Sequence, residues 1–321
     1  MTATEQEATG APGGGTYVDL ARALHANLRR VFLGTPHAVT VAVVAALSGG
    51  HLLIEDVPGV GKTVLASSLA ASLGTGLSRV QGHADLLPTD VTGVSTYSQD
   101  TGAWEFRPGP VFAHVLLVDE LNRTPPRTQS ALLEAMEEAQ VTVDGQSWPL
   151  PRPHLVIATQ NPVGQLGTYP LVESQLDRFA LATSLGYPDA EAETRLALRH
   201  GGRAALGTLT PVCAAATWQR AVEATRAVHV AQEVAGYAVA LGRATREASP
   251  VRLGASPRAS ITLVRSAQAH ALLYGRGYVS PGDVQAMAVP TLAHRLVTEG
   301  RPGAGAAIVG EVLRTTAAPR P

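Results

Sequence analysis

The chain has 321 residues, with 25 Lys and Arg against 26 Asp and Glu, and 45% of its residues are hydrophobic. This length suggests about two domains, and the apolar content excludes a wholly disordered chain. The near balance of charge argues against a protein whose main partner is nucleic acid or an acidic membrane surface.

The cysteine content and the hydropathy pattern predict a soluble cytoplasmic protein. A single cysteine, Cys213, rules out an intrachain disulfide and a Cys-based zinc site, and it fits a reducing compartment. No apolar run reaches the ~18 residues of a membrane-spanning helix, because polar residues and glycines at 48–51 interrupt the longest one. The polar, Gly-rich N-terminus lacks the pattern of a signal peptide. We therefore expect no direct membrane insertion and a disordered leader at residues 1–16.

Short apolar runs alternate with helical patterns between residues 17 and 187, which is typical of a parallel α/β sheet. Buried strands are predicted at 51–55, 115–119 and 155–159, and helices at 63–73 and 127–139. On the second helix, Glu134, Glu137 and Glu138 are interpreted as a solvated face. Two hairpins are predicted, at 94–97 with 104–107 and at 141–143 with 147–150.

From residue 188 onward the strand pattern ends. Helices are predicted at 189–200, 214–228, 231–247, 260–274, 281–292 and 304–315. The fold class is therefore an α/β core at 17–187, with a parallel sheet and inserted hairpins, plus a smaller all-α domain at 188–321. Trp104, Phe106 and Trp148 on the two hairpins are interpreted as packing residues, with contact to another protein as the alternative.

Residues 55–63, Glu-Asp-Val-Pro-Gly-Val-Gly-Lys-Thr, lie between a predicted strand and a predicted helix. The backbone N–H groups of such a turn converge on one concavity, and the helix start adds free N–H groups and a positive dipole end. Lys62 supplies a charge to the β and γ phosphates, and the Thr63 hydroxyl can bind Mg²⁺. The predicted ATP-binding residues of this loop are Pro58, Gly59, Val60, Gly61, Lys62 and Thr63.

Two details of this loop stand out. Asp56 occupies the position of the usual first glycine, six residues before the lysine. Lys62 is the only lysine among the 25 cationic residues, all others being arginine. A chain that uses arginine everywhere else and lysine here strengthens the interpretation as a nucleotide site.

Polar residues follow the next two predicted strands. Asp119 and Glu120 end the apolar run at 115–119, so they are expected at the carboxyl edge of the sheet, where open α/β sheets bind ligands. Asp119 suits Mg²⁺ coordination, and Glu120 suits activation of the water that attacks the γ-phosphate. Asn161 follows the third strand, where it can orient that water or contact the phosphate.

A longer pattern runs from residue 49 to 296. It consists of the strings GGHLLIEDVPGVGKT, DLLPTDVTG, FRPGPVF, VDELNRTPPRTQSALLEAMEEAQVTVDG, ATQNP, GTYPLVESQLDRFA, LGASPRASITL and LAHRL. On these strings the sequence resembles the MoxR family of AAA+ ATPases.

The resemblance implies an AAA+ P-loop core with a helical lid, assembled as a homo-oligomeric ring, usually a hexamer, with ATP and Mg²⁺ at each subunit interface. Lys62 and Thr63 match the Walker A pair, Asp119 and Glu120 the Walker B pair, and Asn161 sensor 1.

The resemblance also assigns two arginines of the pattern. Arg178 matches the arginine finger and Arg258 matches sensor 2. An arginine delivered by a neighbouring subunit can be worth about 10³–10⁵ in rate. The sequence leaves open whether Arg258 acts within its own subunit or across the interface.

By resemblance, the function is that of a chaperone-like remodeller that matures or activates a client complex, often beside a protein with a von Willebrand factor A domain. The client is not identifiable from the sequence. The alternatives are the motor subunit of a chelatase-like metal-insertion complex, a nucleic-acid-remodelling ATPase and a small-molecule P-loop kinase. Few basic residues in the two hairpins argue against nucleic acid, and a kinase needs neither Arg178 nor a lid arginine.

The chain departs from the family pattern at a few positions. Gly164 and Leu166 stand where acidic residues are expected, and Val172 replaces an expected proline. None of these positions removes a predicted catalytic group. The first two are expected near the subunit interface, where they can alter assembly or turnover.

Overall fold

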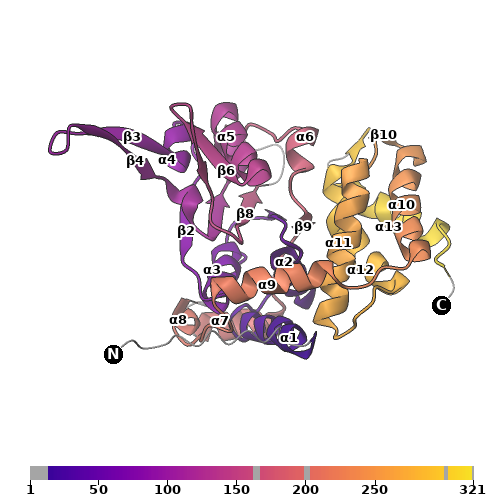
Figure 1. Cartoon of the computed structure of the whole chain (residues 1–321). Coiled ribbons are helices and arrows are strands. Elements are labelled where there is room, and N and C mark those ends of the chain that lie inside the picture. The colour runs from indigo at the N-terminus through magenta and orange to yellow at the C-terminus, as the bar shows by residue number, and fades with distance from the viewer. Residues whose placement is uncertain (1–13, 162–166, 199–202, 300–302, 320–321) are drawn as a thin grey trace, which may run out of the picture.

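The computed structural model describes residues 14–161, 167–198, 203–299 and 303–319, which form an α/β core beside a helical lid (Figure 1). The core contains a five-stranded parallel sheet in the order β2-β5-β8-β1-β9. Its strands are β1 (Leu52–Glu55), β2 (Leu77–Gln81), β5 (Val115–Asp119), β8 (Leu155–Gln160) and β9 (Leu181–Thr183). The three predicted strands are confirmed as β1, β5 and β8. The sequence did not predict β2 and β9, which form the two edges.

Alternate residues of the central strands enter two apolar clusters, one on each face of the sheet. Leu52 and Ile54 of β1 belong to one cluster, and Leu53 between them belongs to the other. Parallel sheets are covered on both faces, which explains why β1, β5 and β8 are almost uniformly apolar. The first face packs against α1 (Gly14–Val31), α2 (Pro36–Ser48) and α3 (Lys62–Ser72), and the second against α4 (Pro88–Thr92) and α5 (Pro126–Glu138).

Helix α2 lies between the sheet and the lid. Every residue from Ala38 to Ser48 is buried, so the helix has no polar face and gives no amphipathic pattern. Thr35 caps its N-terminus and Gly49, at φ 68°, ends it in the left-handed conformation. The indole of Trp218 donates a hydrogen bond to the Ala46 carbonyl at 2.9 Å, which attaches α9 (Ala215–Arg226) to this buried helix.

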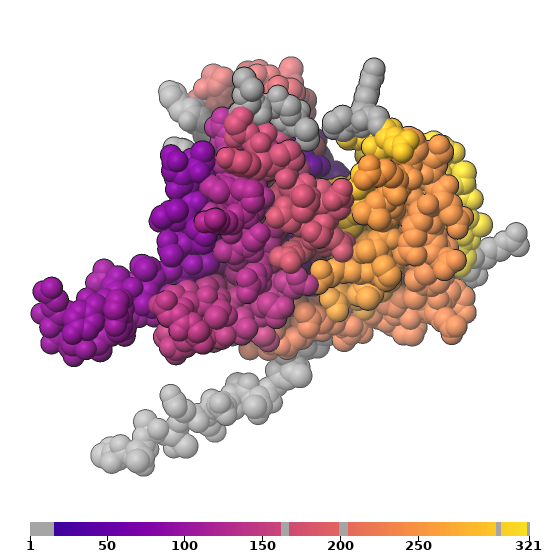
Figure 2. All heavy atoms as spheres, turned by 90° about the horizontal axis from the view of Figure 1, so that it is seen from above, coloured from indigo at the N-terminus to yellow at the C-terminus, as the bar shows by residue number. Residues whose placement is uncertain are grey.

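Both predicted hairpins are confirmed, as β3 (Gly93–Ser98) with β4 (Ala103–Pro108) and β6 (Gln140–Val143) with β7 (Gln146–Pro149). Phe106 and Trp148 stack with ring centroids 4.5 Å apart, in line with the packing role predicted for them. Trp104 differs, because it is 72% exposed and its ring contacts Tyr97 near the tip of the first hairpin. Figures 1 and 2 show that this hairpin projects well away from the rest of the core.

The chain after residue 188 is mainly helical, as predicted. The helices are α7 (Ala190–Leu198), α8 (Arg203–Leu206), α9 (Ala215–Arg226), α10 (Gln232–Glu247), α11 (Pro257–Leu273), α12 (Pro281–Leu292) and α13 (Gly305–Thr315). Helices α8 and α9 return along the core onto α3 and α2, whereas α10–α13 form the separate bundle in orange and yellow (Figure 1).

Two expectations are corrected. Strands do occur after residue 188, because β10 (Val251–Leu253) pairs antiparallel with β11 (Val297–Thr298). These two segments are too short to produce an alternating pattern in the sequence. In addition, α1 begins at Gly14, inside the leader predicted for residues 1–16. None of the helices in the described part of the chain is long and apolar enough to cross a membrane.

A buried histidine joins three elements of the core. The Nδ1 of His51, just before β1, accepts a hydrogen bond from the Val156 N–H of β8 at 3.1 Å. Its Nε2 donates to the Met136 carbonyl of α5 at 3.2 Å. The bond that Nδ1 accepts requires the neutral imidazole, and burial, with the nearby His154, lowers the pKa of His51 to about 4 although the bond to Met136 opposes this effect.

We expect the folded protein to lose stability as the pH falls from 6.5 to 4. In the unfolded chain His51 takes up a proton near its ordinary pKa of 6.5, whereas in the folded chain it does so only near 4. This one group should lower the free energy of unfolding by about 2 kcal/mol between pH 7 and pH 5. Urea denaturation of the wild type and of His51→Gln at both pH values measures the difference. An equal pH dependence in the two proteins would contradict this account.

Candidate active site

The loop between β1 and α3 has the local geometry of a phosphate site. Gly59 and Gly61 have φ angles of 88° and 96°, a region that other residues adopt only with strain. Gly61 is the N-cap of α3, and no side chain caps this helix. The free N–H groups and the positive dipole end of α3 therefore remain available to an anion.

One pocket contains nearly all the residues predicted to bind or hydrolyse ATP. It is lined by Pro58, Gly59, Gly61, Lys62, Thr63, Asp119, Glu120 and Asn161, together with Val64, Arg79, Gln81 and Thr159. Three predicted residues are not part of its lining: Arg178 and Arg258, which lie elsewhere, and Val60, whose side chain is partly buried against the hydrophobic core. The carboxyl ends of β2, β5 and β8 thus bring their polar residues to the phosphate loop, as expected for an open α/β sheet.

The ammonium of Lys62 is held at the base of this pocket. Its Nζ donates to the backbone carbonyl of Asp56 at 2.5 Å, and the residue is only 8% exposed. Burial lowers the pKa of Lys62, and the carboxylates of Asp56, Asp119 and Glu120 partly oppose that effect. The only lysine of the chain is therefore a desolvated cation directed at the phosphate loop.

Glu120 is held in a strained backbone conformation with φ 56°. Its N–H donates to the Thr159 hydroxyl at 2.9 Å, and its Oε1 accepts from the Asn161 amide at 3.0 Å. Arg123 donates to Oε2 at 3.1 Å. The structure thus brings together Glu120 and Asn161, which the sequence placed on different strands, and fixes the direction of the Glu120 carboxylate.

Sequence reasoning missed Arg79 on β2. Its Nε donates to the Asp119 Oδ2 at 2.7 Å, across neighbouring strands, and its side chain is 47% exposed. Gln81, two residues further along the same strand, donates from its side-chain amide to the Glu120 carboxylate at 3.4 Å. The sequence of β2 is only weakly apolar because these polar side chains belong to the site. The sequence therefore predicted neither the strand nor its contribution to the pocket.

Asp56 acquires a definite role from the structure. Its Oδ1 accepts from the Val57 N–H, and its Oδ2 accepts from the Ser184 hydroxyl and from the N–H groups of Leu185 and Gly186 at 2.6–2.9 Å. Burial alone would raise the pKa of this carboxyl, but these hydrogen bonds outweigh it and lower the pKa. The residue that departs from the usual loop pattern connects the loop to the chain just after β9.

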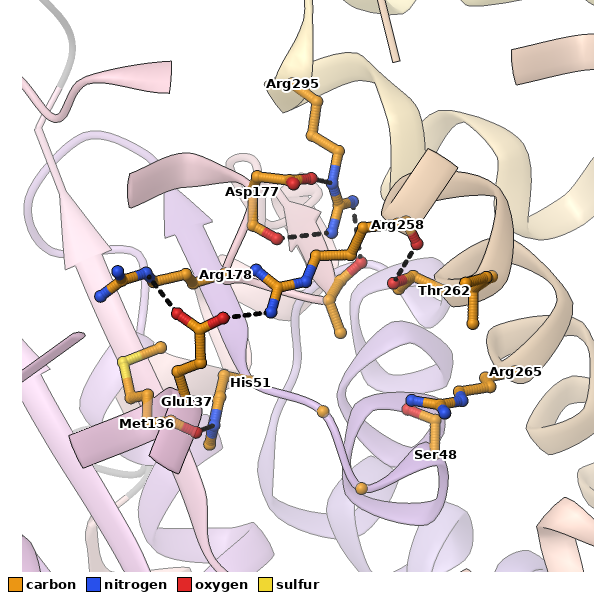
Figure 3. A pocket seen from close by; sticks show the side chains of 14 residues that line it. Ser48, His51, Met136, Glu137, Asp177, Arg178, Arg258, Thr262, Arg265 and Arg295 are labelled. Carbon is orange, nitrogen blue, oxygen red and sulfur yellow. Dashed lines mark hydrogen bonds and ion pairs between the residues drawn. The ribbon is translucent and has the colours of Figure 1, made fainter. Parts of the chain in front are cut away.

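The two predicted arginines lie outside the phosphate pocket. Arg178 and Arg258 line a second pocket, between α5, the end of α2 and the lid helix α11 (Figure 3). Both bind Glu137 of α5: the Arg178 Nε lies 3.1 Å from Oε2, and Arg258 donates to Oε1. Glu137 is exposed, as its predicted place on a solvated face requires, but it also pairs with two arginines, which the sequence did not predict. The hydrogen bond from Arg258, together with the charges of both arginines, lowers the pKa of Glu137 against the effect of its partial burial.

The departures from the family pattern give a mixed result. Val172 precedes α6 (Glu173–Leu176), where it is 52% exposed and makes no part of the phosphate pocket. Gly164 and Leu166 lie outside the described residues.

Comparisons with known proteins agree with this geometry. Residues 51–181 match the ATPase family associated with various cellular activities, and residues 243–312 match the AAA lid domain. The crystal structure of a Cytophaga hutchinsonii protein described as a candidate ATPase superimposes with a TM-score of 0.86 at 34% identity, covering 96% of this chain and 97% of that one. Fold and family match together define an AAA+ protein, with a P-loop α/β core and a lid.

Two relatives make the assignment more specific. The YeaC protein of Bacillus subtilis (strain 168) is 47% identical over 274 residues, which are 84% of this chain and 85% of YeaC. The chaperone MoxR1 of Mycobacterium tuberculosis (strain H37Rv) is 39% identical over 285 residues, 84% of this chain and 74% of MoxR1. The chain belongs to the MoxR family of AAA+ ATPases.

The Asp56 contacts predict a loss of stability on substitution. Asp56→Asn keeps the side-chain size but removes the charge that accepts four hydrogen bonds, so the free energy of unfolding at pH 7 should fall by about 2–3 kcal/mol. Because the folded pKa is lowered, this contribution is present above the ordinary carboxyl range and disappears as the pH falls below it. Chemical denaturation at pH 7 measures the effect. Asp100→Asn, at an exposed turn, is the control, and equal stability of the two variants would refute the anchoring role.

Proposed function

We propose that the protein is a MoxR-type remodelling ATPase that hydrolyses ATP in a ring of six identical subunits. The observation that carries the proposal is that the predicted catalytic residues of one chain lie in two different pockets. The phosphate-binding and water-orienting residues share one pocket, and Arg178 and Arg258 share another with Glu137. A ring joins the second pocket of one subunit to the first pocket of its neighbour.

The phosphate pocket fits ATP with Mg²⁺. Left-handed glycines, an uncapped helix start and the buried Lys62 ammonium suit the triphosphate. Thr63 and Asp119 supply the few protein oxygens that Mg²⁺ needs when phosphate and water complete its shell. Mg²⁺, when bound, neutralises charge on the β and γ oxygens.

Within this pocket, Glu120 is the proposed base that orients and polarises the attacking water. The amide of Asn161 holds the Glu120 carboxylate at 3.0 Å, so a shift of Asn161 toward the γ-phosphate would also redirect Glu120. Lys62 stabilises the charge of the transferred phosphoryl group.

Arg178 is the proposed arginine finger and Arg258 the proposed sensor 2, both acting on the nucleotide of a neighbouring subunit. Action of Arg258 within its own subunit has little support, because the residue does not line its own phosphate pocket and instead shares Glu137 with Arg178. Glu137 keeps the two guanidinium groups together, so that they meet one phosphate as a pair.

The client is a protein complex that this ring assembles, matures or activates in the cytoplasm, with a von Willebrand factor A domain protein as the partner. The projecting hairpin supports a protein client, because Tyr97 and Trp104 expose 55% and 72% of their surface near its tip. Asp100 and Glu105 on the same hairpin disfavour a nucleic acid as the client.

Lys62→Arg is expected to reduce ATP turnover by at least about 100-fold although it conserves the charge. The Lys62 ammonium occupies a buried position against the Asp56 carbonyl, and a planar, delocalised guanidinium does not reproduce its compact point charge there. A phosphate-release assay measures turnover. Arg314→Lys, an exposed exchange of the same two residue types, should leave turnover unchanged, and an active Lys62→Arg protein would refute the proposed role.

Glu120→Gln is expected to bind ATP as tightly as the wild type and to lose about 10²–10⁴-fold in turnover. The amide keeps the size of the side chain but cannot take up a proton from water. The ATP-bound variant should persist as an assembled ring in size-exclusion chromatography with light scattering. Full turnover, or loss of nucleotide binding, would contradict the assignment of Glu120.

A further inference from the structure

The backbone that carries Arg178 is held by a single buried arginine of the lid. Arg295 lies in the short 3₁₀ turn after α12, within the LAHRL string, and its side chain is 3% exposed. Its Nε donates to the Asp177 carboxylate at 2.7 Å. Its Nη2 donates to the Phe179 carbonyl at 2.6 Å and to the Asp177 carbonyl at 3.2 Å.

The remaining N–H donors of Arg295 bind the same segment and the lid. Its Nη1 donates to the Ala180 carbonyl at 3.2 Å and to the Thr291 carbonyl within the lid. A guanidinium has five N–H donors in a rigid plane, and each has an acceptor here. Four of the five acceptors belong to residues 177–180, the segment that contains Arg178.

Two further lid residues hold this segment. His294 is fully buried, so its pKa is well below the usual value, and its neutral ring donates from Nε2 to the Phe179 carbonyl at 3.1 Å. The Ser256 hydroxyl, at the start of α11, donates to the Asp177 carboxylate at 3.1 Å. The residues on both sides of Arg178 are thus fastened to the lid, whereas the Arg178 side chain itself reaches Glu137 on the core (Figure 3).

We propose that Arg295 is a positioning residue that couples the Arg178 segment, which is also anchored in the core through Phe179 and the Ala180 N–H, to the lid. When nucleotide in one subunit moves its lid, Arg295 transmits that movement to Arg178, and so changes the arginine offered to the next subunit. This inference rests on the proposed function, since it requires Arg178 to act across an interface. It gives the lid arginine a role in coupling neighbouring ATP sites, beyond the stability that a buried ion pair provides.

Mixed rings separate positioning from stability. Donor subunits carry Glu120→Gln, so they offer Arg178 but do not hydrolyse ATP. Acceptor subunits carry Arg178→Ala, so they keep the phosphate pocket but offer no finger. Neither variant alone should turn over ATP, and mixing them should restore turnover at interfaces where a donor faces an acceptor.

Arg295→Lys is then placed in one kind of subunit at a time. Lysine keeps the charge but has three donors on a flexible stem, so it does not hold four backbone and carboxylate acceptors together. In donors the substitution should reduce the restored turnover by at least about tenfold. In acceptors, where no finger is present, the reduction should be several times smaller. Asp177→Asn should give the same asymmetry with a smaller loss, and Arg314→Lys in either subunit should change nothing.

An equal loss in both placements would show that Arg295 only stabilises the fold, and no loss in either would show that the contacts do not position Arg178. Both outcomes overturn the inference and leave the proposed function intact. Failure of the unmodified donor and acceptor to restore turnover would instead refute the proposed action of Arg178 across the interface, and the role of Arg295 with it.

Discussion

The arrangement of the site depends on the hydrogen bonds that the carboxylate of Asp56 accepts. This carboxylate ties the start of the phosphate loop to residues 184–186, just after the edge strand β9. Residues 177–180, just before the same strand, are held by Arg295 of the lid. The short strand β9 therefore links the two parts. The residues after it are bound to the phosphate loop, and the residues before it are bound to the lid. The phosphate loop is thus connected to the segment that carries Arg178 through the hydrogen bonds of Asp56 and the backbone of β9.

Arg178 and Arg258 lie away from the phosphate pocket of their own subunit. Glu137 binds Arg178 and Arg258 together on α5, while Lys62, Glu120 and Asn161 occupy the carboxyl edge of the sheet. Under the proposed function, the phosphate pocket of one subunit has the groups that bind ATP and orient water, but it lacks the two further cations, Arg178 and Arg258, that act at the transition state. Under the proposed function, assembly supplies those cations, so that hydrolysis reports on contact between subunits.

The sequence predicted the elements and residues whose signals are local. Strands β5 and β8 are apolar except at their carboxyl ends because both faces are buried, and the phosphate loop is a contiguous motif with a mechanism. The sequence did not predict helix α2, because this helix is buried on every side and has no amphipathic period. The sequence did not predict three features of the site, because each depends on contacts between distant segments. These are the contact of Arg79 with Asp119, the anchoring role of Asp56 and the pairing of Glu137 with two arginines. A carboxylate on an amphipathic helix gives the same sequence signal whether it faces water or an arginine pair.

The central claim is that the phosphate pocket is complete in each subunit for binding and incomplete for hydrolysis. Measuring both activities across a dilution series tests it most directly, with ATP binding followed by fluorescence and turnover expressed per subunit. The account predicts that affinity stays constant while turnover per subunit falls steeply as light scattering shows the rings dissociating. Turnover per subunit that is independent of protein concentration, and equal in isolated subunits and in rings, would contradict it.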